Sequence, residues 1–155
     1  MKLGEVLKRE RERKKITIED VAVRLGIDAD EYTEIENGNS GAEEWGPRLA
    51  LIAIKLQVPT SRLIAETGKS KQARQVNGQC GKLIRAQREK RELTIQELAD
   101  NIQVPLSQME SIEEGGTPLE HYAPLLLAFA EVIDQPIFNL FYPCGLPLDK
   151  LTDYP

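Results

Sequence analysis

The 155-residue chain has few of the side chains that perform chemistry or cross-link a fold: two cysteines, one histidine and one tryptophan. Cys80 and Cys144 lie far apart and lack the spacing of a metal site, so we expect reduced thiols, no metal and no cofactor. His121 stands alone, without a nucleophile motif or a phosphate-binding glycine loop, and is expected on the surface. These absences argue against an enzyme.

Long apolar segments are also missing. The longest apolar runs, from Leu49 to Ile54 and from Ala123 to Ala130, are far shorter than the roughly 18 residues that a membrane helix needs. The N-terminal residues lack the apolar core of a signal peptide. With 41% hydrophobic and 29% charged residues, the composition is that of a globular chain. We therefore expect a cytoplasmic protein that makes no membrane contact.

Positive charge is scarce overall, since the net charge is −5, but it is concentrated in two segments. Residues 1–15 carry seven Lys and Arg against three Glu, and residues 69–91 carry eight against one, net +4 and +7. Residues 16–68 carry four against ten acids, and residues 92–155 carry one against eleven, net −6 and −10. A basic segment therefore opens each half of the chain, either to contact phosphates or as a solvated helix face.

The two halves are copies of one another. A shift of 77 residues aligns positions 4–64 with 81–141 without a gap, and 15 of these 61 pairs are identical. A repeat of this length indicates a duplicated structural module. We predict four segments: a first domain at 1–65, a basic polar linker at 66–80, a second domain at 81–142 and an irregular C-terminal tail at 143–155.

Each copy is predicted to form five short helices. Thr17 and Thr94 are typical N-caps for the second helix, and Gly26 is typical of the position just after it. Apolar residues in the fourth helix recur with helical spacing, and no segment alternates with the period of a strand. The sequence predicts an all-α fold. In the first copy the helices are expected at 3–15, 17–25, 28–36, around 49–56, and after Pro59, with equivalents 77 residues later.

The order of helix, short turn and helix, followed by Ile35-Glu36-Asn37-Gly38, resembles the Xre/Cro-type helix-turn-helix family of phage repressors. Ile112-Glu113-Glu114-Gly115 repeats this signature in the second copy. Both copies are about two residues longer than the family between this glycine and the fourth helix, which leaves that loop's conformation open. Trp45 and Tyr122 lie there, and we expect them to pack against their own core or the sister domain rather than form an exposed docking patch.

An arginine in each first helix continues an apolar line. Leu3, Leu7 and Arg11 share one helix face, and Arg88 occupies the same place in the second copy. A guanidinium on a buried face needs a carboxylate partner. The resemblance implies that Arg11 pairs with Glu36, and that Arg88 pairs in the same way with Glu113.

The resemblance implies that the third helix of each copy enters the major groove of DNA. The base-facing positions of the first copy are Ala29, Asp30, Thr33 and Glu34, which is an acidic set unsuited to a phosphate array. The second copy is the better candidate. Its base-facing set is Leu106, Ser107, Gln108, Glu110 and Ser111, and its candidate DNA-backbone contacts are Lys69, Lys71, Arg74, Lys82, Arg85, Lys90, Arg91 and Thr94.

Two functions are therefore favoured over an enzymatic one. The first is a transcriptional regulator that binds double-stranded DNA, its two domains forming an internal pseudo-dimer. The second is a helix-turn-helix module that contacts a protein partner through its acidic faces, as an antitoxin does, with little DNA binding. Either is compatible with a monomer or a homodimer.

Overall fold

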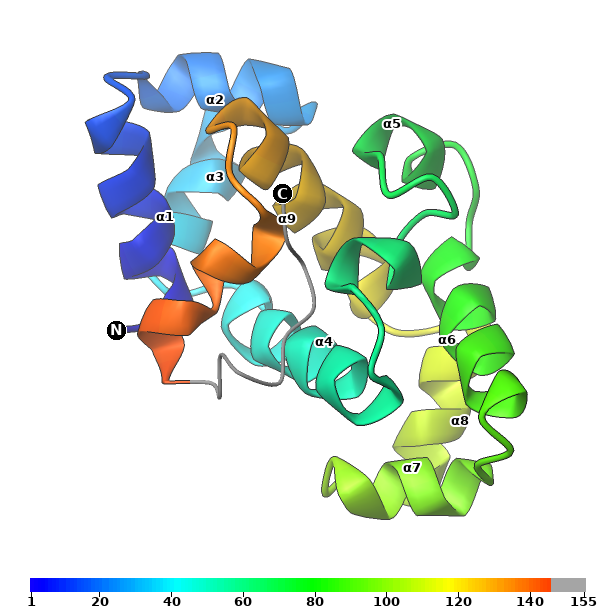
Figure 1. Ribbon diagram of the computed structural model, residues 1–155. Helices are drawn as coiled ribbons and strands as arrows, with labels where there is room; N and C mark the ends of the chain where they lie inside the picture. Colours follow the sequence, from blue (N-terminus) through cyan, green and yellow to red (C-terminus); the bar gives the residue numbers. More distant parts are fainter. Residues whose placement is uncertain (146–155) are drawn as a thin grey trace.

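The computed structural model describes residues 1–145 and shows only helices in this part of the chain (Figure 1), so the predicted all-α class is confirmed. The α-helices are α1 (Leu3–Arg13), α2 (Ile18–Leu25), α3 (Ala29–Glu36), α4 (Ala42–Leu56), α5 (Ser70–Ala73), α6 (Gln79–Lys90), α7 (Ile95–Asn101), α8 (Leu106–Glu114) and α9 (Leu119–Val132). Three short 3₁₀ helices are η1 (Thr60–Leu63), η2 (Ile137–Leu140) and η3 (Tyr142–Cys144).

The repeat is visible in the helix starts, because α2 and α7, α3 and α8, α4 and α9, and η1 and η2 each begin 77 residues apart. The predicted fifth helices are only 3₁₀ turns. The segment predicted as a linker contains one short helix, α5. The tail expected to be irregular begins instead with η3, and residues 146–155 lie outside the described part.

The fourth helix of each copy begins before the predicted position. Trp45 and Tyr122 lie inside α4 and α9, not in a loop. Pro47 and Pro124 are accommodated within these helices, although each removes one backbone hydrogen bond. The reason is tertiary packing, since Trp45 is buried and most of a helix's stability in a protein comes from its packed face.

The two copies exchange their fourth helices. Helix α9 packs along α2, and α4 reaches α6 and α7 (Figure 1). The rings of Tyr32 in α3 and Phe129 in α9 stack with centroids 6.3 Å apart, and both side chains are fully buried. The turns η1 and η2 follow their helices, because η1 contacts α6 and η2 contacts α1. One lobe therefore combines α1–α3 with much of α9 and with η2, and the other combines α6–α8 with part of α4 and with η1. Helices α4 and α9 also keep contacts with α1 and α6 of their own copies.

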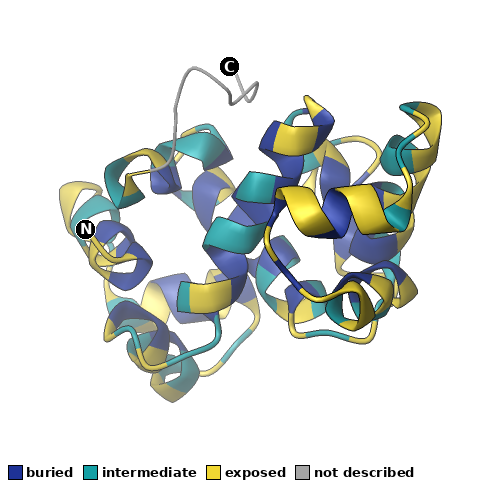
Figure 2. Ribbon diagram, turned by 90° about the horizontal axis from the view of Figure 1, so that it is seen from below, coloured by how far each residue is buried: buried dark blue, intermediate teal, exposed yellow. Residues whose placement is uncertain are grey.

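This exchange differs from the two contiguous five-helix domains expected from the repeat. Helices α4 and α9 lie against one another in the middle of the molecule (Figure 1), and the buried apolar residues form one cluster. Figure 2 shows buried segments in both lobes. Where the two helices meet, a Cβ on Gly46 would lie only 2.6 Å from Leu3 Cδ2 and 3.2 Å from Leu126 Cδ1.

A glutamate near the start of each fourth helix, Glu43 in α4 and Glu120 in α9, holds that helix against the first helix of the same copy. Glu43 accepts hydrogen bonds from the backbone N–H groups of Leu3 and Gly4, at 3.2 and 2.7 Å. Glu120 does the same for Cys80 and Gly81, at 3.2 and 2.9 Å. These bonds satisfy donors that a helix start leaves unpaired.

Gly4 and Gly81 themselves allow the close approach of these first helices to the ends of α3 and α8. A Cβ on either residue would lie 2.4 Å from a carbonyl oxygen, that of Ile35 or Ile112. Larger residues would therefore separate the two helices. Close helix packing therefore explains why both copies have glycine at this position.

Candidate nucleic-acid interface

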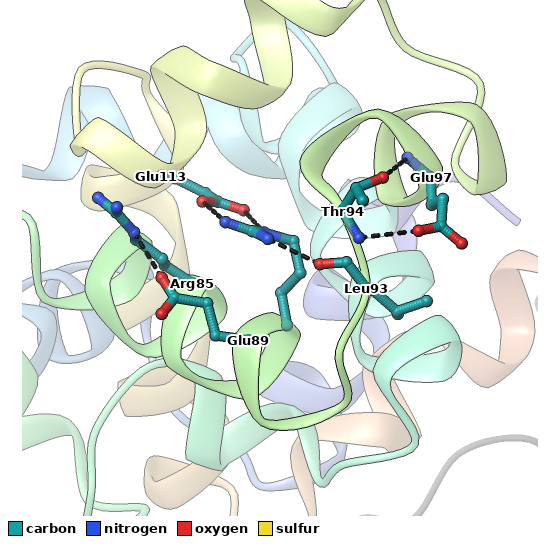
Figure 3. Close-up of polar contacts among 7 residues, drawn as sticks. Arg85, Glu89, Leu93, Thr94, Glu97 and Glu113 are labelled. Carbon is teal, nitrogen blue, oxygen red and sulfur yellow. Dashed lines mark hydrogen bonds and ion pairs between the residues drawn. The ribbon is translucent and has the colours of Figure 1, made fainter.

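Two pairs of consecutive helices occupy equivalent places in the repeat, α2–α3, here called the first unit, and α7–α8, the second unit. The hydroxyl of Thr17 accepts a hydrogen bond from Asp20 N and caps α2, whose end is marked by Gly26 at φ 75°. In the second unit Thr94 and Glu97 form a reciprocal capping box (Figure 3), and the hydrogen bonds from Thr94 lower the pKa of Glu97. The helix starts expected from the threonines are thus observed.

A buried arginine–glutamate pair locks each unit onto its first helix. Arg11 donates to the two carboxylate oxygens of Glu36 at 2.6 and 3.1 Å, and Arg88 to those of Glu113 at 2.6 and 3.0 Å. Each guanidinium also donates to a backbone carbonyl before the second helix, that of Leu93 in Figure 3. The hydrogen bonds to the glutamates raise the pKa of both arginines.

Helix α8 offers an uncommitted polar surface at its first turn. Leu106, Ser107 and Glu110 are exposed, and Gln108 and Ser111 are half-buried, whereas Met109 points into the core and is fully buried. The five residues selected from the sequence therefore remain accessible, to different degrees. Their hydroxyl and amide groups can donate to or accept from base edges, and the leucine can contact a thymine methyl group.

The candidate backbone contacts divide into two groups. The first group surrounds the second unit. Lys82 follows the glycine packed on the end of α8, Lys90 is the last residue of α6, and Thr94 caps α7; all three are exposed. Arg85 pairs with Glu89 at 2.8 Å (Figure 3), which engages its guanidinium. Arg91 donates to the Gln57 carbonyl at 3.3 Å and to Gln87 Oε1 at 2.7 Å, and thus joins the halves.

The second group, Lys69, Lys71 and Arg74, lies on or beside α5. This helix packs on α9, and α6 separates it from α7 in Figure 1. Arg74 Nη1 would be 3.6 Å from a Cβ on Gly26, so it lies over the turn of the first unit. The structure does not bring these linker cations together with α8.

Several of the acidic side chains in and directly before α3 take part in structural contacts. The carboxylate of Asp28 caps the helix by accepting from Glu31 N at 2.7 Å, and Glu36 belongs to the arginine pair described above. Glu31 Oε1 lies 2.6 Å from His121 Nε2. Only Asp30 and Glu34 among the acids of α3 lack a side-chain partner in the described residues.

Sequence reasoning missed the contact between Glu31 and His121. The histidine is exposed, as expected, but α9 places it beside the first turn of α3. No spacing in the sequence could have indicated this, because the two residues lie 90 positions apart and meet only through the helix exchange.

Other kinds of site are not apparent in residues 1–145. No group of three or more His, Cys, Asp and Glu side chains there could hold a metal ion. No single helix there is long and apolar enough to cross a membrane; α9 together with η2 and η3 reaches that length only across a bend of 100°.

Comparison with known proteins identifies the first unit. Residues 2–51 match the family described as a helix-turn-helix domain, a span that contains α1, α2, α3 and the first part of α4. No curated protein and no solved structure matches the chain.

Proposed function

We propose that the chain is a cytoplasmic, non-enzymatic transcriptional regulator of the Xre/Cro type, an internal pseudo-dimer whose second helix-turn-helix unit reads double-stranded DNA. The observation that carries this proposal is the first turn of α8, where Ser107 is exposed and Gln108 and Ser111 are partly accessible. The first residues of the second helix in such a unit are those that contact bases. The family match of the first unit supports the general activity.

In this arrangement phosphate contacts come from the exposed Lys82, Lys90 and Thr94, which lie around α6 and the start of α7. They set the position of the protein on the duplex without reading sequence. Ser107 and Ser111 form hydrogen bonds to base edges. Helix α3 does not enter a groove, because its free carboxylates would face phosphates.

A salt-dependent binding assay tests this proposal. The two cations Lys82 and Lys90 neutralise two phosphates, which gives a slope of roughly −2 for log affinity against log salt. Lys82→Ala or Lys90→Ala should lower affinity for all sequences and reduce the slope by about 0.9 each. Ser107→Ala with Ser111→Ala should instead blunt sequence preference at an unchanged slope.

The matched control uses α3. Asp30→Ser and Glu34→Ser change exposed positions of the equivalent helix, and they should leave DNA affinity unchanged or raise it by relieving repulsion. A sequence-specific loss on changing Asp30 would show that the first unit is the reader. Absence of DNA binding by the wild type at about 50 mM salt, where phosphate contacts are favoured, would exclude the regulator function.

The second candidate function is a protein-interaction module. Asp30 and Glu34 favour it, since both are exposed and neither has a cationic partner in residues 1–145. A basic surface on another protein would satisfy them. This function predicts that Asp30→Ser and Glu34→Ser abolish partner capture while Lys82→Ala has no effect, the reverse of the outcome for DNA.

A further inference from the structure

A cleft of about 240 Å³ lies where three segments of both halves meet. Leu25 in α2 and Leu125 in α9 provide apolar lining, and both are buried. Arg74, Asn77 and His121 supply polar groups from the linker and from α9. The cleft therefore combines an apolar wall with a few hydrogen-bonding groups, which is the usual composition of a small-molecule site.

The arginine that lines this cleft, Arg74, has no acidic partner in the described residues. Arg74 is exposed and forms no salt bridge in the described part of the chain. The carboxylate that also lines the cleft, Glu120, already accepts hydrogen bonds from the backbone N–H groups of Cys80 and Gly81. A guanidinium beside an open cleft can form two parallel hydrogen bonds with a bound carboxylate.

Apolar surface is also left uncovered at the same place. Val76 lines the cleft and is 42% exposed, which is unusual for the large apolar residues of this protein. The opposite side is formed by Gly26, whose added Cβ would meet only Arg74 within 4 Å. The equivalent position of the second unit holds Gln103, so the open space is a property of the first unit.

We propose that this cleft binds a small organic carboxylate with an apolar body, about the size of benzoate. Arg74 holds the carboxylate, Asn77 donates a further hydrogen bond, and Leu25, Leu125 and Val76 cover the apolar part. The volume is below the roughly 300–1,000 Å³ of sites for drug-sized ligands, so the part of the ligand that the cleft holds is small. This ligand site does not depend on DNA binding, although it lies directly behind the turn that begins α3.

Titration of the full chain with benzoate tests the proposal, with benzamide as an uncharged probe of the same shape and acetate as a charged probe without a ring. Benzoate should bind with a dissociation constant of about 1 mM, as expected for a ligand of this size, and raise the melting temperature. Benzamide and acetate should each bind at least about tenfold more weakly, because each lacks one half of the recognition.

Two variants localise the site. Arg74→Gln should weaken benzoate binding at least about tenfold, whereas Arg62→Gln, which removes an exposed arginine elsewhere, should not. Gly26→Asn places a side chain in the cleft at a backbone φ of 75°, which asparagine tolerates, and should block binding. Gly145→Asn is its control, since that glycine also has a positive φ and nothing lies within 4 Å of its added Cβ.

Three results would overturn the proposal. They are equal binding of benzoate and benzamide, unchanged binding in folded Arg74→Gln, and no binding of benzoate by the wild type at about twenty times the expected dissociation constant. Circular dichroism of each variant establishes that it is folded. None of these measurements uses DNA, so their failure and the failure of the regulator function are separate outcomes.

Discussion

Replacing Tyr32 and Phe129 by leucine, singly and together, measures whether the two halves share their fourth helices. Both rings are fully buried, and they stack with centroids 6.3 Å apart and planes 17° apart. Each single replacement should destabilise the protein by about 1–2 kcal/mol, since it leaves a small cavity. An aromatic pair in this geometry contributes about 0.5–1.5 kcal/mol beyond its buried area. The double variant should therefore be less destabilised than the sum of the single variants by that amount.

The control cycle pairs Tyr32 with Ile52, which occupies in α4 the place that Phe129 has in α9. In a contiguous domain Ile52 would lie against Tyr32, whereas in this structure Phe129 of α9 lies there. Tyr32→Leu and Ile52→Val should then be additive within about 0.5 kcal/mol. Urea unfolding at constant m gives the free energies. Additivity for Tyr32 with Phe129 together with coupling for Tyr32 with Ile52 would refute the exchange.

Four further outcomes are expected. Arg88→Met should lower stability by up to about 3–5 kcal/mol, because it leaves the buried carboxylate of Glu113 unpaired. Its control, Arg85→Met, breaks an exposed pair and should cost about 0–1 kcal/mol. Equal melting temperatures of the two variants would contradict a buried, paired role for Arg88. Burial raises the pKa of Glu120, so the folded state holds this proton more tightly than the unfolded chain and loses stability as pH rises from about 4 towards 7; Glu120→Gln should gain stability relative to the wild type over that interval. Burial also raises the pKa of the Cys80 thiol, which should react with a thiol reagent only after unfolding, and a rapid reaction in the native state would show that the site opens. The buried Trp45 should emit at short wavelength and resist quenching by iodide, and a red-shifted, freely quenched emission would place it in solvent.

Local structure could be read from the sequence where its cause is local. The caps at Thr17 and Thr94, the glycine after α2 and the all-α class all follow from residues within one turn of the feature. The need of Arg11 and Arg88 for a carboxylate was also foreseeable, since each arginine continues an apolar helix face, and the family resemblance implied which glutamates they pair with.

The helix exchange could not be predicted, because the two copies are so alike that each fourth helix could pack on its own half or on the other. Leu49 and Ala53 are identical to Leu126 and Ala130, so either fourth helix presents a suitable apolar face to either half. Close packing at Gly46, where α4 meets Leu3 and Leu126, is a tertiary contact that no local pattern in the sequence indicates. The place of His121 beside α3 and the position of Arg74 over Gly26 follow from the same global arrangement, so the sequence could not predict them either.

The exchange also fixes when the protein can fold during its synthesis. The first half leaves the ribosome with α1, α2 and α3 complete, but α9, which completes their core, begins only at Leu119. Until then Tyr32 has no Phe129 to pack on, and apolar surface of the nascent lobe stays open to solvent or to chaperones. The second lobe, by contrast, finds α4 already made. The second lobe can therefore close once α8 is complete, whereas the first must wait for α9 and η2, so a chain that ends between the halves has no finished core.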